Sequence, residues 1–382
     1  MSDDRVHILH VCGARPNFVK VAPVMAAVEA WNATRVEAGG VQFWQTLVHT
    51  GQHYDAGLSD VFFQQLGLPE PDYHLGVGSG SHAAQTAHVL EGLEPVLLQE
   101  RPDLVIVVGD VNSTVAAALC ATKLAIPVAH VEAGLRSGDR DMPEELNRLL
   151  TDQLADLLFT TERSAGENLA REGIDPARVH FVGNTMIDTL ERLLPHARGG
   201  EALHRLRLTA CGHGLVTLHR PSNVDDAVQL DALARALRCI AQRVPLVWPV
   251  HPRTHARLGK PRPTGSGSAK PRLLLTEPLG YLDFLQLMDG ARLVLTDSGG
   301  IQEETTVLGV PCLTLRTTTE RPVTLTEGTN RLVDPHDGAA IVGAVDEVLA
   351  APMPVGVRPE LSDGHAAERI VAVIADWATR RS

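Results

Sequence analysis

Residues 293–304, with the sequence LVLTDSGGIQEE, decide how the second half of the chain folds. A short apolar run typical of a buried strand ends in an Asp-Ser-Gly-Gly turn, and a helical pattern follows. A strand that passes through glycines into a helix presents bare backbone N–H groups and the positive end of the helix dipole to an anion. We therefore predict a phosphate site at Ser298, Gly299 and Gly300, with Glu304 further into the helix, where its carboxylate can reach a ribose hydroxyl.

The same alternation of short apolar runs and helical patterns covers the whole chain. The predicted strands are residues 6–11, 43–48, 104–108, 128–131, 157–160 and 179–182, and then 214–218, 246–250, 273–275, 293–296, 312–315 and 332–333. Such alternation is typical of parallel sheets covered by helices, so the predicted fold class is α/β with two Rossmann-like, doubly wound domains.

The domains are expected at residues 1–195 and 196–362. A last helical pattern in residues 363–382 follows a proline-rich break, and we expect it to pack back on the first domain. Residues 259–270 form the low-complexity stretch GKPRPTGSGSAK, which predicts a surface loop without a function.

Composition excludes several classes of function. The 382 residues carry a net charge of -12 with 34 scattered Lys and Arg residues, which argues against a nucleic-acid partner. No apolar run approaches the roughly 18 residues of a membrane span, and the polar N-terminus predicts a cytoplasmic protein. Five dispersed cysteines and 17 histidines show no metal-ligand spacing, so we expect neither disulfides nor a metal.

Polar residues follow successive predicted strands of the first domain. Because the carboxyl ends of parallel strands meet at one edge of a sheet, we expect these side chains to converge. They are Arg15 and Lys20 after the first strand, Gln52 after the second, Asp110 after the third, Glu132 after the fourth, and Glu144, Asn147 and Arg148 in the helix that Pro143 opens. Glu145 lies off that helix face and is expected to point outward or to cap.

The second domain repeats this arrangement around its phosphate turn. His219 and Arg220 follow its first strand, His251 follows its second, and Arg321 follows its fifth. A single such histidine is equally well explained as a satisfied core residue, and Arg321 as a salt bridge at a helix start. Together they predict donors around a diphosphate, in a cleft between two domains whose active edges face each other.

Taken in order, these motifs resemble the non-hydrolysing UDP-N-acetylglucosamine 2-epimerases. The matching motifs are GARP with Lys20, GD at 109–110, VEAGLR at 131–136, PEELNR at 143–148, GNTMID at 183–188, His219-Arg220, PVHP at 249–252, DSGGIQEE at 297–304 and TTERP at 318–322. The resemblance implies a GT-B fold, a homodimer, and interconversion of UDP-GlcNAc and UDP-ManNAc without a redox cofactor or an obligatory metal.

The resemblance also implies roles for the residues. UDP leaves to give 2-acetamidoglucal and adds back after a proton reaches C2 from the other face. Asp110, Glu132 and Glu144 would take and return this proton and stabilise positive charge, with base and acid unassigned, while His219 serves the phosphate end. The residues implied to bind UDP are Arg15, His251, Ser298, Gly299, Gly300 and Glu304, and those implied to position substrate are Lys20, Gln52, Asn147, Arg148, Arg220 and Arg321.

The sequence departs from the family pattern in three places. Asn17 stands where many members carry an acidic residue, and the connection from Glu132 to the Pro-Glu-Glu helix is about two residues shorter. The segment Gly78–His82 replaces the Gln and Arg residues with which several bacterial members bind an activating second UDP-GlcNAc. These departures suggest a sub-branch with a different acyl group or nucleotide, in cell-envelope or secondary-metabolite sugar pathways.

Three other functions remain open from the sequence. A hydrolysing 2-epimerase would release free ManNAc and UDP, although such enzymes usually begin with a different glycine-arginine motif. A GT-B glycosyltransferase would need an acceptor pocket that no motif supplies. A catalytically silent nucleotide-sugar binding protein is opposed by Asp110, Glu132 and His219, and kept open by Asn17.

Overall fold

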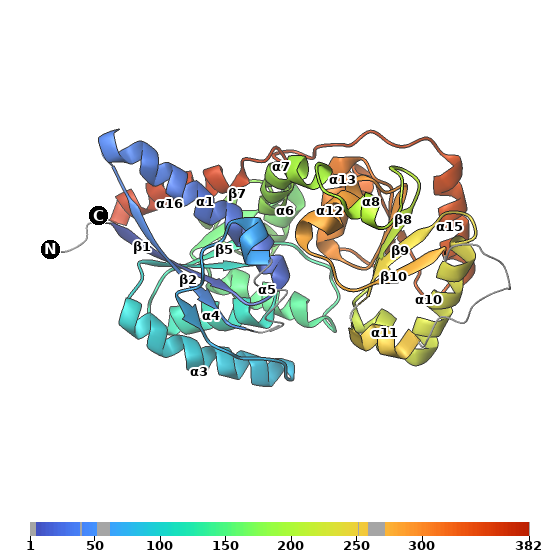
Figure 1. Ribbon diagram of the computed structural model, residues 1–382. Helices are drawn as coiled ribbons and strands as arrows, with labels where there is room; N and C mark the ends of the chain where they lie inside the picture. Colours follow the sequence, from blue (N-terminus) through green and yellow to red (C-terminus); the bar gives the residue numbers. More distant parts are fainter. Residues whose placement is uncertain (1–4, 39, 52–61, 251, 259–271, 382) are drawn as a thin grey trace. The chain divides into compact units, whose positions relative to one another are not determined.

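The computed structural model describes residues 5–38, 40–51, 62–250, 252–258 and 272–381 (Figure 1). The chain divides into two compact units, one formed by residues 1–192 and 360–382 and the other by residues 193–359. The sequence places these boundaries at 195 and 362. Gln52, His251 and the predicted loop at 259–270 lie outside the described residues.

The first unit is built on a parallel sheet of seven strands in the order β3-β2-β1-β4-β5-β6-β7. The strands are β1 (Val6–Cys12), β2 (Phe43–His49), β3 (Tyr73–His74), β4 (Leu104–Val108), β5 (Val128–Ala133), β6 (Leu157–Thr160) and β7 (Val179–Phe181). The chain starts in the middle of this sheet and winds outward in both directions. The carboxyl ends of β1, β4 and β5 are therefore neighbours at one edge.

Helices cover both faces of this sheet (Figure 1). They are α1 (Arg15–Ala38), α3 (His82–Glu100), α4 (Asn112–Lys123), α5 (Pro143–Leu154), α6 (Arg163–Arg171) and α7 (Thr185–Arg198), with a short 3-10 turn at Pro176–Arg178 and the C-terminal α16 (Ala366–Arg381). Leu93 and Leu97 of α3 and Ala117 and Ala121 of α4 pack on Val107 of β4 in one buried cluster. On the other face α1 lies beside α16.

The C-terminal helix is tied to the first unit at its start. Both carboxylate oxygens of Asp188, on α7, accept hydrogen bonds from backbone N–H groups at the start of α16, from Ala366 at 3.1 Å and from Ala367 at 2.7 Å. A buried side chain thus caps the helix that follows the second unit in sequence. The chain returns to the first unit just before this cap.

Gly183 lies where the chain passes close to the main chain of Leu361 as it returns to the first unit. Its φ is +91°, and an added Cβ would lie 2.1 Å from the carbonyl oxygen of Leu361. We expect Gly183→Ala to lower the free energy of unfolding by about 3 kcal/mol in urea denaturation, because backbone strain and a clash with rigid main chain add together. Gly173 also has a positive φ, +79°, but open space around it. The control Gly173→Ala should lose only about 1 kcal/mol, and equal losses in the two variants would contradict this explanation.

The second unit contains a parallel sheet of six strands in the order β10-β9-β8-β11-β12-β13. The strands are β8 (Gly214–Thr217), β9 (Leu246–Pro249), β10 (Leu273–Thr276), β11 (Leu293–Thr296), β12 (Cys312–Leu315) and β13 (Asn330–Val333). The helices are α8 (Ala202–Arg205), α9 (Pro221–Val224), α10 (Ala227–Ile240), α11 (Pro252–Leu258), α12 (Tyr281–Asp289), α13 (Gly299–Leu308), α14 (Val323–Thr326) and α15 (Gly338–Ala350). Trp248 of β9 is fully buried in the core between the sheet and the α10 and α15 helices.

These two sheets confirm the predicted α/β class with parallel strands. Each predicted apolar run overlaps an observed strand, with ends that differ by up to two residues, because strands buried on both faces read as continuous Val, Ile and Leu. The strand β3 was not predicted, since its two residues are too few to show a pattern. The end of β5 also differs, because the strand continues through Glu132 with a shift of register.

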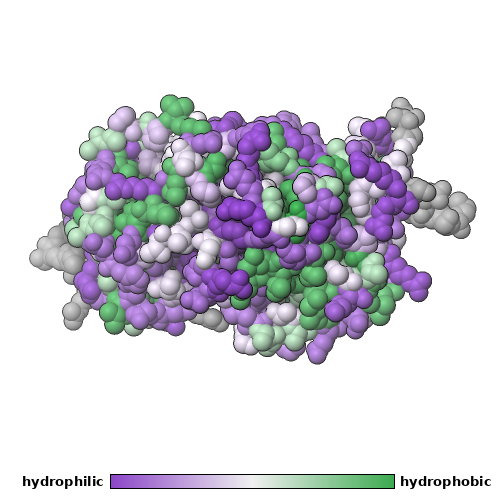
Figure 2. Space-filling view, turned by 180° about the vertical axis from the view of Figure 1, so that it is seen from behind, coloured by the Kyte–Doolittle hydropathy of each residue, from purple (hydrophilic) through white to green (hydrophobic). Residues whose placement is uncertain are grey.

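The surface seen in Figure 2 is largely hydrophilic, with smaller hydrophobic areas between the polar ones. Every helix in the described part of the chain is too short or too polar to cross a membrane.

Candidate active site

Asp110 follows β4 and is held by a buried arginine. Nη1 of Arg148 lies 2.5 Å from Oδ2 of Asp110, and the Arg148 side chain is only 1% exposed. Asn147 donates from Nδ2 to the backbone oxygen of Asp110 at 2.9 Å. The first turns of α5 therefore fix both the backbone and the carboxylate of Asp110, which stays partly accessible, with 22% of its side chain exposed.

Glu132 occupies a strained position in β5. Its φ is +74°, a region that non-glycine residues rarely adopt, and the register of β5 against β6 shifts between Val131 and Ala133. Oε1 of Glu132 lies 2.7 Å from Nζ of Lys20, and both residues are buried. Bulges and left-handed residues often re-aim a side chain at a functional site. Here the bulge directs a carboxylate toward a cation at the start of α1.

Gly109 brings these two acids together. A Cβ at Gly109 would lie 3.1 Å from Nζ of Lys20 and 4.0 Å from Oε1 of Glu132, so the Lys20–Glu132 pair lies against the turn that carries Asp110. The structure thus brings Lys20, Asp110, Glu132, Asn147 and Arg148 to one edge of the sheet. Glu144 is half-buried at the start of α5, beside this cluster in sequence.

Glu145 does not point outward, so that expectation was wrong. It is 2% exposed, and its carboxylate accepts hydrogen bonds from the backbone N–H groups of Ser137 and Gly138 at 2.9 and 3.0 Å and from Nη2 of Arg148 at 2.7 Å. Burial favours a raised pKa, but these donors lower the pKa of Glu145 below its usual value. The loop after β5 folds over α5 and supplies donors that helix periodicity alone cannot indicate.

Asn17 supports the turn after β1. Its Oδ1 accepts from the backbone N–H groups of Gly13 and Ala14 at 3.2 and 3.0 Å, and its Nδ2 donates to the backbone oxygen of Val108 at 2.8 Å. A carboxylate could accept the first two bonds but could not donate the third. The amide therefore joins the ends of β1 and β4 without adding a charge beside Lys20.

A buried histidine network, which the motifs did not reveal, supports the same edge. His130 of β5 contacts the backbone oxygen of Gly109 through Nε2 at 2.8 Å and Oδ1 of Asp152 through Nδ1 at 2.6 Å. Asp152 also accepts from the backbone of Gly134 and pairs with Arg136. Burial acts to raise the pKa of Asp152, but His130 and Arg136 lower it. The sequence signal that could have revealed this network is His130, a polar residue inside an apolar strand.

The second unit contains the predicted phosphate turn. Ser298 precedes α13, and Gly299 and Gly300 are its first residues. Gln302 fixes the turn, because its Nε2 donates to the backbone oxygen of Ser298 at 3.1 Å and its Oε1 accepts from the Thr319 hydroxyl at 2.7 Å. The turn therefore has a fixed shape at the end of β11, where the backbone N–H of Ser298 donates to the Thr296 hydroxyl at 3.0 Å and Gly299 and Gly300 begin α13.

Arg321 packs against this turn from the side. A Cβ at Gly299 would lie 2.3 Å from Nη1 of Arg321 and 2.5 Å from Oε1 of Glu320, so a larger residue would have to displace these side chains. The guanidinium is buried and pairs with Glu303 at 2.8 Å and with Glu320. The salt bridge that was the alternative explanation for Arg321 is thus present, and it lies directly beside the phosphate turn.

His219 has a partner that the motifs did not assign to it. Nδ1 of His219 lies 3.1 Å from Oδ1 of Asp297, whose carboxylate also accepts from the backbone N–H groups of His219 and Arg220 and from Nδ2 of Asn223. Asp297 is fully buried, while 62% of the His219 side chain is exposed. Burial acts to raise the pKa of Asp297, but His219 lowers it below its usual value. The ring is therefore anchored through Nδ1, and its outer edge is exposed.

The remaining predicted residues are placed as follows. Arg15, at the start of α1, is half-buried with its guanidinium 5.5 Å from the centre of the Phe62 ring. Arg220 is half-buried beside His219, and Glu304 is buried in α13. No group of three or more His, Cys, Asp or Glu among the described residues is arranged to hold a metal ion.

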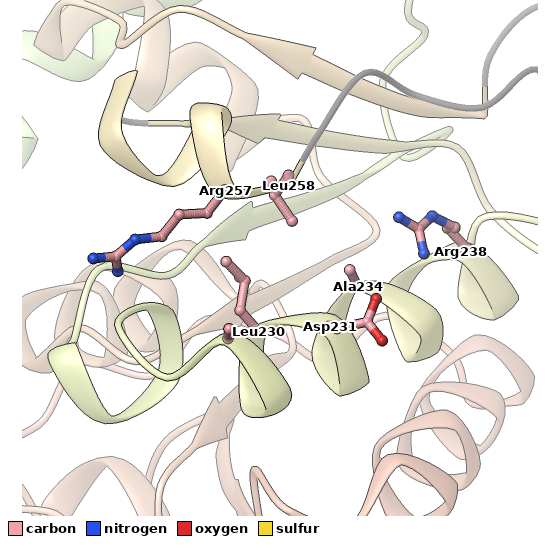
Figure 3. Close-up of a pocket in the computed structure, with 7 residues that line it drawn as sticks. Leu230, Asp231, Ala234, Arg238, Arg257 and Leu258 are labelled. Atoms are coloured by element: carbon pink, nitrogen blue, oxygen red, sulfur yellow. The ribbon is translucent and has the colours of Figure 1, made fainter.

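A pocket elsewhere in the second unit lacks the features of a site (Figure 3). It is lined by Ala227, Leu230, Asp231, Ala234, Arg238, Arg257 and Leu258. Arg257 already donates to the backbone oxygen of Val224 at 2.8 Å, and Asp231 pairs with Arg235. The pocket has neither a glycine turn nor a buried carboxylate, so the strand edges remain the candidate site.

Comparison with known proteins agrees with these clusters. A family model described as UDP-N-acetylglucosamine 2-epimerase matches residues 38–375. A UDP-N-acetylglucosamine 2-epimerase of Methanocaldococcus jannaschii is 40% identical over 369 residues, covering 95% of this chain and 97% of the relative. A UDP-2,3-diacetamido-2,3-dideoxy-D-glucuronate 2-epimerase of Pseudomonas aeruginosa is 42% identical over 332 residues, covering 85% and 88%.

A solved structure agrees as well. The crystal structure of the Methanocaldococcus jannaschii UDP-GlcNAc 2-epimerase in complex with UDP-GlcNAc and UDP matches with a TM-score of 0.84 and 37% identity, covering 97% of this chain and 100% of that chain. The predicted GT-B-like class and the family resemblance are thus confirmed. The chain belongs to the UDP-N-acetylglucosamine 2-epimerase family of isomerases.

Proposed function

We propose that this protein is a non-hydrolysing 2-epimerase that interconverts UDP-GlcNAc and UDP-ManNAc. The observation that carries the proposal is the pairing of acids and cations at the edge of the first sheet, where Asp110 and Glu132 each contact a buried cation. The names of the relatives support the substrate, and so does the UDP-GlcNAc bound to the Methanocaldococcus jannaschii structure.

The reaction begins with loss of the leaving group. The C1–O bond breaks and its electron pair leaves with UDP, so that C1 gains oxocarbenium character and the hydrogen at C2 becomes acidic. A carboxylate among Asp110, Glu132 and Glu144 then takes the C2 proton, giving 2-acetamidoglucal. Return of a proton to the other face of C2, with re-addition of UDP at C1, gives the epimer. Lys20 and Arg148 hold two of these carboxylates in place.

The second unit would stabilise the departing diphosphate. The backbone N–H groups of Gly299 and Gly300, the Ser298 hydroxyl and the dipole of α13 suit its negative charge. His219, oriented by Asp297, would donate to the same oxygens. Arg15, Gln52, Arg220 and His251 complete the proposed contacts, and Glu304 would accept hydrogen bonds from the ribose.

Deuterium exchange tests this function. We expect the protein, incubated with UDP-GlcNAc in D2O without an acceptor, to produce UDP-ManNAc with deuterium at C2, followed by NMR. Free ManNAc would instead identify a hydrolysing enzyme, and absence of exchange would identify a binding protein or a transferase. The same assay with UDP-2,3-diacetamido-2,3-dideoxy-D-glucuronate tests the substrate that the Pseudomonas aeruginosa relative is named for.

The Asp297–His219 pair gives a separate prediction. We expect Asp297→Asn to lower kcat by about 100-fold, because an amide nitrogen cannot accept from Nδ1–H and the imidazole adopts the other tautomer. Asn223→Ala is the control, since it removes a different donor to the same carboxylate and leaves the His219 contact intact. Its kcat should change by no more than about twofold. Equal losses of kcat in both variants would mean that Asp297 maintains the local structure after β8 and β11 and does not act through His219.

We also propose that the protein is a cytoplasmic homodimer. Leu146 and Leu150 support an interface, because they lie four residues apart on α5 and are 40% and 56% exposed. Sedimentation equilibrium measures the mass directly.

A further inference from the structure

The second unit buries a tyrosine against the carboxylate proposed to bind ribose. Tyr281 is the first residue of α12, and its hydroxyl donates to Oε1 of Glu304 at 2.8 Å. Tyr281 is 7% exposed and Glu304 is 2% exposed. Glu304 lies in the second turn of α13, the helix whose first residues form the phosphate turn. The pair therefore belongs to the same local structure as the phosphate site.

We propose that Tyr281 is a positioning residue for nucleotide binding, whose hydroxyl holds Glu304 in the orientation and charge state in which the carboxylate accepts hydrogen bonds from the ribose. The inference rests on the proposed function, which places the ribose at Glu304. It adds to that function a residue that acts on the nucleotide only through Glu304. It also predicts that nucleotide affinity depends on pH.

The charge balance around Glu304 explains why this hydrogen bond matters. Burial raises the pKa of Glu304 to about 7, the Tyr281 hydroxyl opposes this rise, and the charge of Glu303 adds to it. Glu303 is itself paired with Arg321 at 2.8 Å. Among the described residues, Tyr281 is thus observed to donate a hydrogen bond to Glu304, and this hydrogen bond favours the ionised carboxylate.

Other titratable groups on the elements packed against α13 are engaged elsewhere. On α12, Asp283 pairs with Arg205 and Asp289 pairs with Arg198. On β13, Arg331 pairs with Glu347. On β12, burial raises the pKa of the Cys312 thiol to about 11. The α14 segment Val323–Thr326 carries no titratable side chain. Among the groups on these elements, Glu304 is therefore the one expected to titrate near neutral pH, while His219, which the proposed function places at the diphosphate, is the same in every variant compared below.

A pH dependence of binding follows from these contacts. Ionised carboxylates accept stronger hydrogen bonds than neutral carboxyl groups, so binding favours the ionised form of Glu304. Affinity for a UDP-sugar should therefore rise as the pH passes through about 7 and then level off. Loss of the Tyr281 hydroxyl raises the pKa of Glu304 further. The whole binding curve then moves to higher pH.

The test measures the Kd for UDP-GlcNAc by calorimetry from pH 6 to pH 9, because the diphosphate diester does not titrate in that range. We expect Tyr281→Phe to bind about fivefold more weakly at pH 7, which corresponds to a rise of one pKa unit from a value of about 7, and to recover most of its affinity at pH 9. The kcat at saturation should stay close to that of the unaltered protein, with the effect in KM.

Tyr73→Phe is the matched control. Tyr73 also donates its hydroxyl to a glutamate, Glu100, but in the first unit. This variant should bind like the unaltered protein at every pH. A further control, Glu304→Gln, removes the carboxylate, so any pH dependence of binding that remains belongs to the rest of the site, including His219, and Tyr281→Phe should have little additional effect in that background.

The outcomes separate the inference from the proposed function. A loss in Tyr281→Phe that is the same at every pH would show a packing role and overturn the inference. A pH dependence of binding that is the same in the unaltered protein and in Glu304→Gln would also overturn it while leaving the proposed function intact. Failure of the unaltered protein to bind any UDP-sugar would overturn both.

Discussion

Replacing Asp110 with asparagine is expected to lower deuterium incorporation at C2 of UDP-ManNAc by about 10,000-fold, the upper end of what one acid–base group supplies. Asparagine has nearly the same shape and keeps an oxygen that can accept from Nη1 of Arg148. It cannot take a proton from carbon. The backbone contact from Asn147 to residue 110 does not involve the side chain, so the turn should persist.

Binding of UDP separates this effect from unfolding. The proposed phosphate turn lies in the second unit, so Asp110→Asn should bind UDP with a Kd within about threefold of the unaltered protein. The control is Asp103→Asn, at the opposite end of β4, where the carboxylate accepts from the backbone of His7 at 2.8 Å. This control should keep its exchange activity. Undiminished exchange in Asp110→Asn would remove Asp110 from the mechanism.

The fold and the phosphate turn could be predicted because their signals are local. Strands of a parallel sheet are buried on both faces, so each appears as a continuous apolar run in the sequence. The turn at Ser298–Gly300 is likewise specified within a few residues, by the end of a strand, two glycines and the start of a helix. The boundaries of these elements follow from the same short-range pattern.

The partners of the charged residues could not be predicted, because they are distant in sequence. Lys20 and Glu132 are 112 positions apart, and His219 and Asp297 are 78 positions apart. Lys20 lies on α1 and Glu132 on β5, whereas His219 and Asp297 follow the adjacent strands β8 and β11, so only tertiary packing makes each pair neighbours. Glu145 illustrates the same limit, since helix periodicity placed it off the polar face, and the loop at Ser137 and Gly138 then buried it.

The strained backbone at Glu132 could not be predicted from the sequence pattern either. A glutamate in an apolar run predicts a polar strand end, but a φ of +74° and a register shift arise from the contacts of β5 with its neighbours. Strain of about 1–3 kcal/mol persists when surrounding structure over-determines the conformation. The Lys20 contact at 2.7 Å is one of the interactions that fix this side chain.

Lys20→Met should therefore be the most destabilising change at the site. It leaves the Glu132 carboxylate buried without the Lys20 cation, and breaking a buried ion pair on one side costs about 3–5 kcal/mol of unfolding free energy. Deuterium exchange at C2 should be lost at the same time, because the carboxylate is no longer held in its proper position. Urea denaturation and the NMR exchange assay measure the two effects.

The double variant Lys20→Met with Glu132→Gln separates stability from catalysis. Replacing both partners with neutral groups removes the buried charge, so the double variant should recover most of the stability that Lys20→Met loses. It should remain inactive, since an amide cannot take the C2 proton. Strictly additive losses of stability would show that the 2.7 Å contact carries no coupling. Recovered stability without activity would instead mean that the Lys20–Glu132 pair is retained for the reaction, at no net gain to the fold.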